Sequence, residues 1–159
     1  HDWAVHVALW EKGDLAAGAV YMPARKILFG TQAPPSYPPP HEGRLRLACS
    51  RTRLPAFLGE LAEALDAELV PMGSAGVKVA AVIAGDADAY VHAGGQYEWD
   101  SAASVAVARV TGLHTSRVDG SPMTYNRPGA KLPDLLVCRA DLAGRLLSAL
   151  SSLNLNGNI

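Results

Sequence analysis

The sequence predicts an α/β layered sandwich in which an antiparallel meander is followed by an α/β subdomain. Apolar residues alternate along the first 30 positions and are interrupted only by turn residues, which is typical of adjacent strands. Strand-like and helix-like segments then alternate from residue 44 to residue 153, and this favours a sheet with helices on its faces. Residues 33–41, between the two parts, contain five prolines, so we expect an extended surface loop there.

Length and composition exclude several classes of protein. The chain has 159 residues, 49% hydrophobic and 18% charged, so it can bury a core and is not expected to be disordered. Lys and Arg number 14 against 15 Asp and Glu, whereas a general binder of nucleic acid or acidic membranes needs a positive excess. Cys49 and Cys138 lie in apolar strand-like runs, which favours reduced thiols and a cytoplasmic protein, with a disulfide as the alternative. No signal peptide and no apolar run of about 18 residues is visible.

Residues 1–32 are expected to form the end of an N-terminal antiparallel-sheet subdomain. Its strands are predicted at residues 3–10, 15–22 and 26–29. The first strand is apolar at both parities, which predicts burial on both faces. Chain termini are usually exposed, yet His1 directly precedes this strand. We therefore expect the chain to be the later part of a longer protein.

Residues 44–153 are expected to form a C-terminal α/β subdomain, reached through a Pro-rich loop at residues 33–43 and followed by a frayed tail at residues 154–159. The predicted strands are at 44–49, 68–71, 87–92, 115–118 and 135–139, and the predicted helices are at 55–67, 74–84, 100–111 and 141–153. The helices carry apolar faces, and Gly85 and Gly112 end two of them. We expect the Pro-rich loop to be a plain connector. The alternative is that it is a ligand motif for an SH3 domain.

The helix predicted at residues 74–84 is apolar on all sides except at Lys78. The amino end of a helix is already positive, so a lysine there is unfavourable unless an anion lies nearby. Gly73 and Gly76 would let an anion approach the backbone amides. We therefore predict that Gly73, Ser74 and Lys78 bind an anion. The alternative is a lysine whose stem packs on the surface and whose charge stays in water.

A second candidate anion contact follows the strand predicted at residues 44–49. Ser50, Arg51 and Arg53 lie between that strand and the next helix, and strand ends are where α/β sheets place ligand-binding loops. Arginine and hydroxyl groups bind phosphate well. We expect these residues to line the same cleft as Gly73, with a solvated loop as the alternative.

Asp100 begins the helix predicted at residues 100–111, where an aspartate commonly caps the first turn. A carboxylate fixed there can also be one ligand of a hard cation such as Mg²⁺, although one carboxylate is not a metal site. His92 ends a neighbouring predicted strand and is a further candidate contact, with a purely structural role as the alternative. The sequence has no zinc-ligand spacing, nucleophile elbow, P-loop or dinucleotide-binding glycine pattern.

Several motifs follow one another over roughly residues 70–140 and resemble the C-terminal half of the inositol monophosphatase-like superfamily. They are Gly73-Ser74-x-x-x-Lys78, Gly85-x-Ala87-Asp88-Ala89-Tyr90, Trp99-Asp100-x-Ala102-Ala103, Asp119-Gly120 and Tyr125-Asn126. The Trp-Asp-x-Ala-Ala element is the specific one. Lys78 makes the chain most similar to the CysQ-type branch, the actinobacterial 3′-phosphoadenosine 5′-phosphate phosphatases. The resemblance implies the layered sandwich of sugar phosphatases, and residues 2–5 resemble the strand after the family's metal-binding loop.

The resemblance also implies a metal centre of about two or three Mg²⁺ ions that activate the attacking water. In the family a Glu, the two Asp of an Asp-Pro-x-Asp-Gly loop and the Asp of the Trp-Asp element hold these ions. Asp100 is the counterpart of the last ligand, and so it is the implied catalytic and metal-binding residue. The Glu, the loop and a Thr that orients the water have no counterpart in this sequence. The chain alone is therefore expected to be incomplete as an enzyme.

The activity that the resemblance implies is Mg²⁺-dependent removal of the 3′-phosphate of 3′-phosphoadenosine 5′-phosphate, giving AMP and phosphate. Inositol monophosphate and fructose 1,6-bisphosphate are implied lesser substrates, and lithium an implied inhibitor. The implied substrate contacts are Ser50, Arg51, Gly73, Ser74, Lys78, His92 and Asp100. The expected partners are the nucleotide and the N-terminal half of the same protein. Nucleic acid and membrane are not expected partners, and a homodimer is left open.

The alternative function is a non-catalytic nucleotide- or anion-binding module that has lost its metal loop. An acidic loop directly before His1 would distinguish the phosphatase from this binding module.

Overall fold

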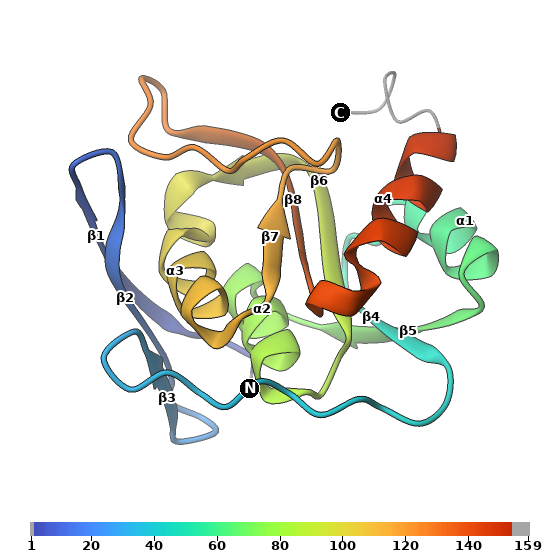
Figure 1. Cartoon of the computed structure of the whole chain (residues 1–159), viewed down its shortest axis with the longest axis horizontal. Helices are drawn as coiled ribbons and strands as arrows, with labels where there is room; N and C mark the ends of the chain where they lie inside the picture. Colours follow the sequence, from blue (N-terminus) through green and yellow to red (C-terminus); the bar gives the residue numbers. More distant parts are fainter. Residues whose placement is uncertain (1, 154–159) are drawn as a thin grey trace.

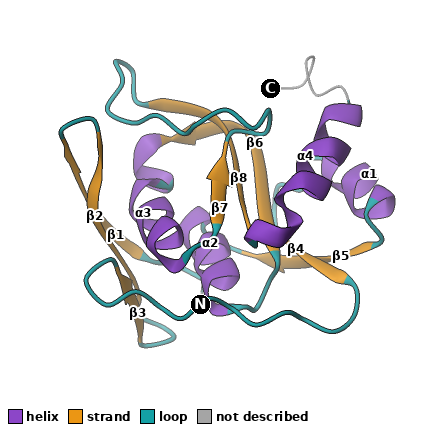
Figure 2. Cartoon of the chain, in the orientation of Figure 1, coloured by secondary structure: helices purple, strands orange, loops and turns teal. Residues whose placement is uncertain are grey.

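The fold is the predicted α/β layered sandwich. A computed structural model describes residues 2–153, and the tail predicted at residues 154–159 lies outside them. The fold consists of a three-stranded sheet, a layer of two helices, a five-stranded sheet and a second layer of two helices. Figures 1 and 2 show how these layers are stacked. The inner helices are α2 (Ala75–Ala84) and α3 (Ala102–Thr111), and the outer helices are α1 (Ala56–Ala64) and α4 (Ala143–Ser152).

The three-stranded sheet is the predicted meander. It consists of β1 (Val5–Glu11), β2 (Asp14–Met22) and β3 (Ile27–Gly30), all antiparallel. Its inner face packs on α3, where Gly18 lies against the backbone of Ala103. The prediction that the first strand is buried on both faces is wrong, because Val7 is 66% and Leu9 55% exposed. Alternate side chains of β1 point away from the helix layer, and no part of residues 2–153 covers that outer face.

The five-stranded sheet has the order β5-β4-β6-β8-β7. Its strands are β4 (Leu45–Ser50), β5 (Ala67–Met72), β6 (Ala89–Tyr97), β7 (His114–Ser116) and β8 (Lys131–Cys138). β4 runs parallel to both β5 and β6, whereas β8 is antiparallel to β6 and to β7. The carboxyl ends of β4, β5 and β6 therefore meet at one edge of the sheet.

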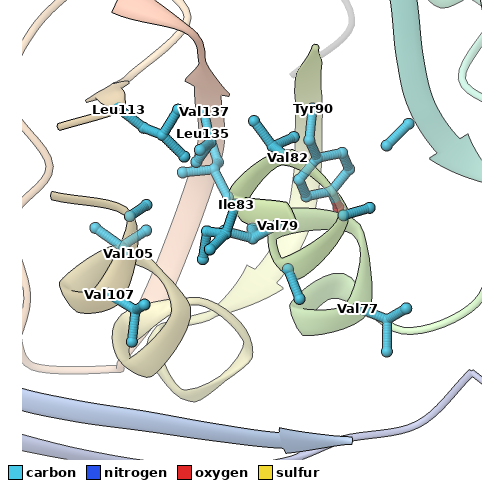
Figure 3. Packing of buried hydrophobic residues seen from close by; sticks show 14 of the residues in the cluster. Val77, Val79, Val82, Ile83, Tyr90, Val105, Val107, Leu113, Leu135 and Val137 are labelled. Carbon is cyan, nitrogen blue, oxygen red and sulfur yellow. The ribbon is translucent and has the colours of Figure 1, made fainter. Parts of the chain in front are cut away.

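Both faces of this sheet are covered by apolar side chains. Between the sheets, valines of α2 and α3 pack against Tyr90, Leu135 and Val137, as Figure 3 shows. On the far face, Leu58 and Leu61 of α1 and residues of α4 pack against alternate residues of β4 and β8. This arrangement fixes the strand ends at which the candidate site lies.

Several predicted boundaries differ from the observed ones for local reasons. The first helix ends at Ala64 rather than at residue 67, because Asp66 has a φ of +47° and turns the chain into β5. The strand expected to stop at residue 92 continues to Tyr97 through a bulge, and β8 begins earlier because Lys131 pairs with Tyr97. The last helix is preceded by a 3₁₀ turn at Ala140–Leu142.

The Pro-rich loop is held against the body of the protein. The amide of Ala140 donates to the hydroxyl of Tyr37 at 2.9 Å, and the Arg139 guanidinium donates to the Pro38 carbonyl at 3.1 Å. Pro38 is buried, so the segment is not presented as a free SH3 ligand.

Cys49 and Cys138 are buried free thiols. None of the described helices combines the length and the apolar character that crossing a membrane requires.

Candidate phosphate-binding and metal-ligating site

The candidate residues gather where the parallel strands end. Ala48 of β4 is opposite Tyr90 of β6, so Ser50 and His92 lie two residues further along neighbouring strands. Ser50 is also opposite Met72, the last residue of β5, and Gly73 follows it directly. Because parallel strands place such residues at one edge, the topology brings Ser50, Gly73 and His92 together.

Arg51 and Gly73 bind the same carboxylate. The Gly73 amide donates to Asp2 Oδ2 at 3.0 Å, the Arg51 guanidinium binds the same oxygen, and Arg25 donates to the other oxygen at 3.1 Å. The Gly73 amide is the main reason that the pKa of Asp2 is lowered, and the two arginines lower it further. These donors therefore form a site that favours a negative charge. Arg51 therefore lies beside Gly73, as we expect from its position at the end of a neighbouring strand.

Ser50 is tied into the loop that it begins. The backbone amide of Arg53 donates to the Ser50 hydroxyl at 3.0 Å, and the amide of Arg51 donates to the Met72 carbonyl at 3.3 Å. The second bond links this loop to the end of β5, directly before Gly73. The arrangement keeps the backbone of the two predicted anion contacts close together.

Lys78 is buried next to the Gly73–Ser74 turn. Its side chain is 6% exposed, and Nζ donates to the Ser74 carbonyl at 2.9 Å. Ser74 has a φ of +57°, an unfavourable backbone conformation for a non-glycine residue, so this bond supports a strained turn. Burial lowers the pKa of Lys78, while Asp2 raises it. The alternative that Lys78 keeps its charge in water is therefore wrong. A contact between Lys78 and the substrate stays a prediction.

The Nζ atom of Lys78 also lies 5.3 Å from the centre of the Tyr90 ring. Such a cation–aromatic contact stabilises a charge that has lost much of its water. Burial raises the pKa of Tyr90, which keeps its hydroxyl neutral. Lys78 thus supplies a positive potential at the strand ends without being exposed.

Asp100 lies in a 3₁₀ turn rather than at the start of the helix. This turn spans Glu98–Asp100, and the Tyr97 amide donates to Asp100 Oδ2 at 2.9 Å. The predicted cap role is wrong, because α3 begins at Ala102 with Ser101 in the preceding position. No donor among residues 2–153 reaches the other oxygen, Oδ1. Asp100 therefore presents one free carboxylate oxygen at the edge of the site.

Two histidines flank Asp100. Burial lowers the pKa of both His6 and His92, and the charge of Asp100 partly opposes this. His92 Nε2 lies 2.7 Å from the Gly94 carbonyl, so this histidine braces the bulge of β6. His6 fits only because position 76 is a glycine: a Cβ on Gly76 would lie 2.0 Å from His6 Nε2.

Sequence reasoning missed Asp2 and His6 as parts of this region. Asp2 precedes β1 and His6 lies on it, and alternation along a strand indicates which face a residue occupies but not which loop it meets. Gly76, in the first turn of an apolar helix, was the available signal for a close approach, but the group that approaches it is His6 and not the predicted anion.

The described residues offer one candidate metal ligand and not a complete metal site. Within residues 2–153, no cluster of three or more His, Cys, Asp or Glu side chains could hold a metal ion. Mg²⁺ prefers octahedral oxygen coordination and is seldom held by a single carboxylate without other oxygen ligands. The free oxygen of Asp100 could fill one position of such a site, and the described residues do not complete it.

Comparison with known proteins places these features in a family. A family model described as the inositol monophosphatase family matches residues 1–154. A 3′-phosphoadenosine 5′-phosphate phosphatase of Mycobacterium bovis is 47% identical over 158 residues, covering 94% of this chain and 59% of that protein. The protein of the same name from Mycobacterium leprae is 44% identical over 168 residues, with the same coverage. The chain thus spans less than two thirds of the length of these relatives.

Solved structures show the same fold. CysQ from Bacteroides thetaiotaomicron superposes with a TM-score of 0.76 at 21% identity, covering 86% of this chain and 62% of that one. Inositol monophosphatase II from Staphylococcus aureus superposes with a TM-score of 0.78 at 18% identity, covering 98% of this chain and 64% of that one. Together with the match over residues 1–154, these findings show that the chain belongs to the inositol monophosphatase family.

Proposed function

We propose that this chain forms the nucleotide-binding part of a phosphatase that removes the 3′-phosphate of 3′-phosphoadenosine 5′-phosphate. The identity of 44–47% to curated relatives of that name supports this substrate. The observation that carries the proposal within the structure is the shared carboxylate of Asp2, because it identifies the Gly73 amide and Arg51 as donors that bind an anion. In this proposal inositol monophosphate and fructose 1,6-bisphosphate are poorer substrates.

The anion contacts come from three strand ends. Ser50 and Arg51 follow β4, Gly73 and Ser74 follow β5, and His92 lies on β6. Lys78 lies beneath the Ser74 turn and adds a positive charge that favours a bisphosphate over a monophosphate. We assign the nucleotide phosphates to this edge.

Asp100 is the proposed catalytic metal ligand. The family is metal-dependent, and we propose Mg²⁺ as the ion, in a site of about two or three ions. When bound, such ions supply an activated water and stabilise negative charge on phosphate oxygens. The role of this chain is to hold the Asp100 carboxylate in place through the Tyr97 amide, with Oδ1 left free. The remaining ligands are proposed to come from the part of the relatives that this chain does not match.

The alternative of a non-catalytic binding module gains no support, since the curated relatives are named as phosphatases. The nucleotide is the proposed small-molecule partner. The buried free thiols of Cys49 and Cys138 support the proposed cytoplasmic location.

The test uses this chain joined to the unmatched portion of the M. bovis relative. Phosphate release from 3′-phosphoadenosine 5′-phosphate is measured with Mg²⁺. Asp100→Asn keeps the shape but removes the charge, so we expect kcat to fall by orders of magnitude while thermal unfolding is unchanged. Asp66→Asn, at a carboxylate whose side chain is 82% exposed and which pairs with Arg44 away from the site, is the matched control and is expected to be active. An Asp100→Asn protein with normal kcat would contradict the assignment.

A second measurement tests the nucleotide branch. Lys78→Met keeps most of the buried volume and removes the charge, so we expect KM to rise more for the bisphosphate than for inositol monophosphate. Lys12→Met, in the exposed β1–β2 turn, is the control. Equal changes of KM for both substrates would contradict the proposal that the charge of Lys78 favours a bisphosphate over a monophosphate.

A further inference from the structure

The carboxylate of Asp2 occupies donors that the proposed phosphate site needs. Its Oδ2 atom accepts from the Gly73 amide at 3.0 Å and from the Arg51 guanidinium, and its Oδ1 atom accepts from Arg25 at 3.1 Å. The Asp2 side chain is 11% exposed. A backbone amide has a single hydrogen to donate, so Asp2 and a phosphate at this position compete for the Gly73 amide.

Asp2 fits closely against the turn that contains Gly73. A Cβ at position 73 would lie 3.1 Å from the Asp2 Cβ and 3.2 Å from the Asp2 carbonyl oxygen. A larger residue at position 73 would therefore crowd Asp2, and glycine lets the carboxylate reach the amide. The contact is thus a specific feature of the folded chain and differs from an ordinary ion pair on the surface.

The segment that carries Asp2 can move without disturbing either sheet. β1 begins at Val5, which pairs with Tyr21, and Asp2 lies three residues before it. Moving Asp2 away therefore breaks its side-chain contacts but no strand pairing. Arg51, by contrast, directly follows β4, and its amide donates to the Met72 carbonyl at 3.3 Å. The donors are therefore held in place independently of the carboxylate.

A phosphate group matches the charges at this edge better than a carboxylate does. Arg25 and Arg51 bind Asp2 directly. Burial lowers the pKa of Lys78, and the charge of Asp2 partly opposes this, so Lys78 also acts on the same carboxylate. A carboxylate supplies one negative charge and two oxygens, whereas a phosphate monoester supplies about two charges and three oxygens. A phosphate can therefore take the place of the Asp2 carboxylate.

We propose that Asp2 is an internal competitor of phosphate at the edge formed by Gly73 and Arg51, and that the substrate displaces its carboxylate on binding. This inference rests on the proposed function, since it assigns a phosphate of the nucleotide to the donors that Asp2 holds. Asp2 then sets the affinity of the site, because the apparent dissociation constant is the intrinsic one divided by the fraction of molecules in which Asp2 has moved away.

The experiment is an NMR titration of the 159-residue chain with inorganic phosphate, without metal, in which the amide resonance of Gly73 reports on the site. Asp2→Asn keeps the shape of the side chain and removes its charge, so we expect it to bind phosphate about tenfold or more tightly than the wild type. Asp2→Ala also removes the acceptor atoms and should bind at least as tightly as Asp2→Asn. The dispersion of the amide spectrum checks that each variant is folded.

Asp86→Asn is the matched control for charge. Asp86 lies 3.8 Å from the same Arg25 but is 62% exposed, so its substitution removes a nearby negative charge without freeing the Gly73 amide. We expect this variant to tighten phosphate binding by about twofold, as for the loss of a surface pair.

Asp2→Ala that binds phosphate no more tightly than the wild type would overturn the inference, because Asp2 would then hold the donors in place for the substrate. Equal tightening by Asp2→Asn and Asp86→Asn would also overturn it, since the effect would be one of overall charge. In both cases the proposed phosphate site stands, because the Gly73 resonance responds to phosphate.

Two further outcomes separate this inference from the proposed function. If the Gly73 amide responds to phosphate in none of the proteins, both the competitor and the phosphate site are wrong. If Asp2→Asn tightens binding as expected but the joined protein releases no phosphate from 3′-phosphoadenosine 5′-phosphate, Asp2 stands as the competitor and the proposed function is wrong.

Discussion

The two sheets share a helix layer but are buried differently. The five-stranded sheet is covered on both faces, and Leu47, Leu135 and Leu136 are all fully buried. The three-stranded sheet is covered on its inner face alone, and its outer face exposes Val7 and Leu28 by about two thirds. Similar alternation of apolar residues therefore occurs both in a sheet that is covered on two faces and in a sheet that is covered on one. The pattern of a strand reports which side chains share a face, whereas the layers of the fold decide whether that face is covered.

The largest expected contrast is in the cost of removing a leucine side chain. Leu136→Ala, on β8, should lower the free energy of unfolding by about 2–5 kcal/mol, because it leaves a cavity in a packed layer. Leu28→Ala, on β3 at 65% exposure, should change it by less than about 0.5 kcal/mol. Urea unfolding of both variants measures the contrast. Equal losses would show that the outer face is buried in solution.

Glycines on the two faces of the three-stranded sheet sharpen the comparison. A Cβ on Gly18 would lie 2.7 Å from both the Ala103 carbonyl oxygen and the Ala106 Cβ, so Gly18→Ala must push β2 away from α3. We expect a loss of about 1–3 kcal/mol in the free energy of unfolding. Gly30→Ala meets its nearest atom at 3.8 Å and should be close to neutral. Thermal unfolding of the pair is the measurement, and a tolerated Gly18→Ala would contradict the close packing on α3.

Acidification should destabilise both sheets through buried histidines. Burial lowers the pKa of His6 in the three-stranded sheet and of His92 and His114 in the five-stranded sheet. Below the unfolded value of about 6.5 the unfolded chain therefore binds more protons, and stability should fall with pH until the folded pKa values are reached. Urea unfolding at several pH values between 7.5 and 5 measures this. His6→Gln and His114→Gln should each flatten the dependence, and an unchanged slope in both would contradict the burial.

The smallest expected effect concerns a surface ion pair between the layers. Arg109 of α3 donates to Asp14 of β2 at 2.9 Å, but the Asp14 side chain is 76% exposed. Asp14→Asn should therefore cost at most about 1 kcal/mol, and less at high salt. Unfolding at low and high salt checks this. A larger, salt-independent loss would mean that the two layers depend on this pair.

Most of the fold could be predicted because the segments are strongly patterned. Helix α2 ends at Gly85 as expected, because Gly85 has a φ of +81°. The end of β6 could not be predicted, because consecutive glycines normally stop a strand, whereas here Gly94 and Gly95 form a bulge after which pairing resumes.

The candidate site was predictable in part. Parallel strand ends and a single cation in an apolar helix pointed to Arg51, Gly73 and Lys78, which the structure brings to one edge. The burial of Lys78 beneath Ser74 could not be read from the sequence, since it depends on how Tyr90 and the strained turn fill the space above α2. The contact of Asp2 with Gly73 spans 71 positions and has no local signal.

The measurement that tests the central claim most directly is phosphate release from 3′-phosphoadenosine 5′-phosphate with Mg²⁺, by the isolated 159-residue chain and by the chain joined to the unmatched portion of the M. bovis relative. The described residues contain no cluster of three or more side chains that could hold a metal ion, and Asp100 is the one metal ligand proposed among them. We therefore expect release from the joined protein and none above background from the isolated chain. Full activity of the isolated chain, or an inactive joined protein that is correctly folded, would contradict the account.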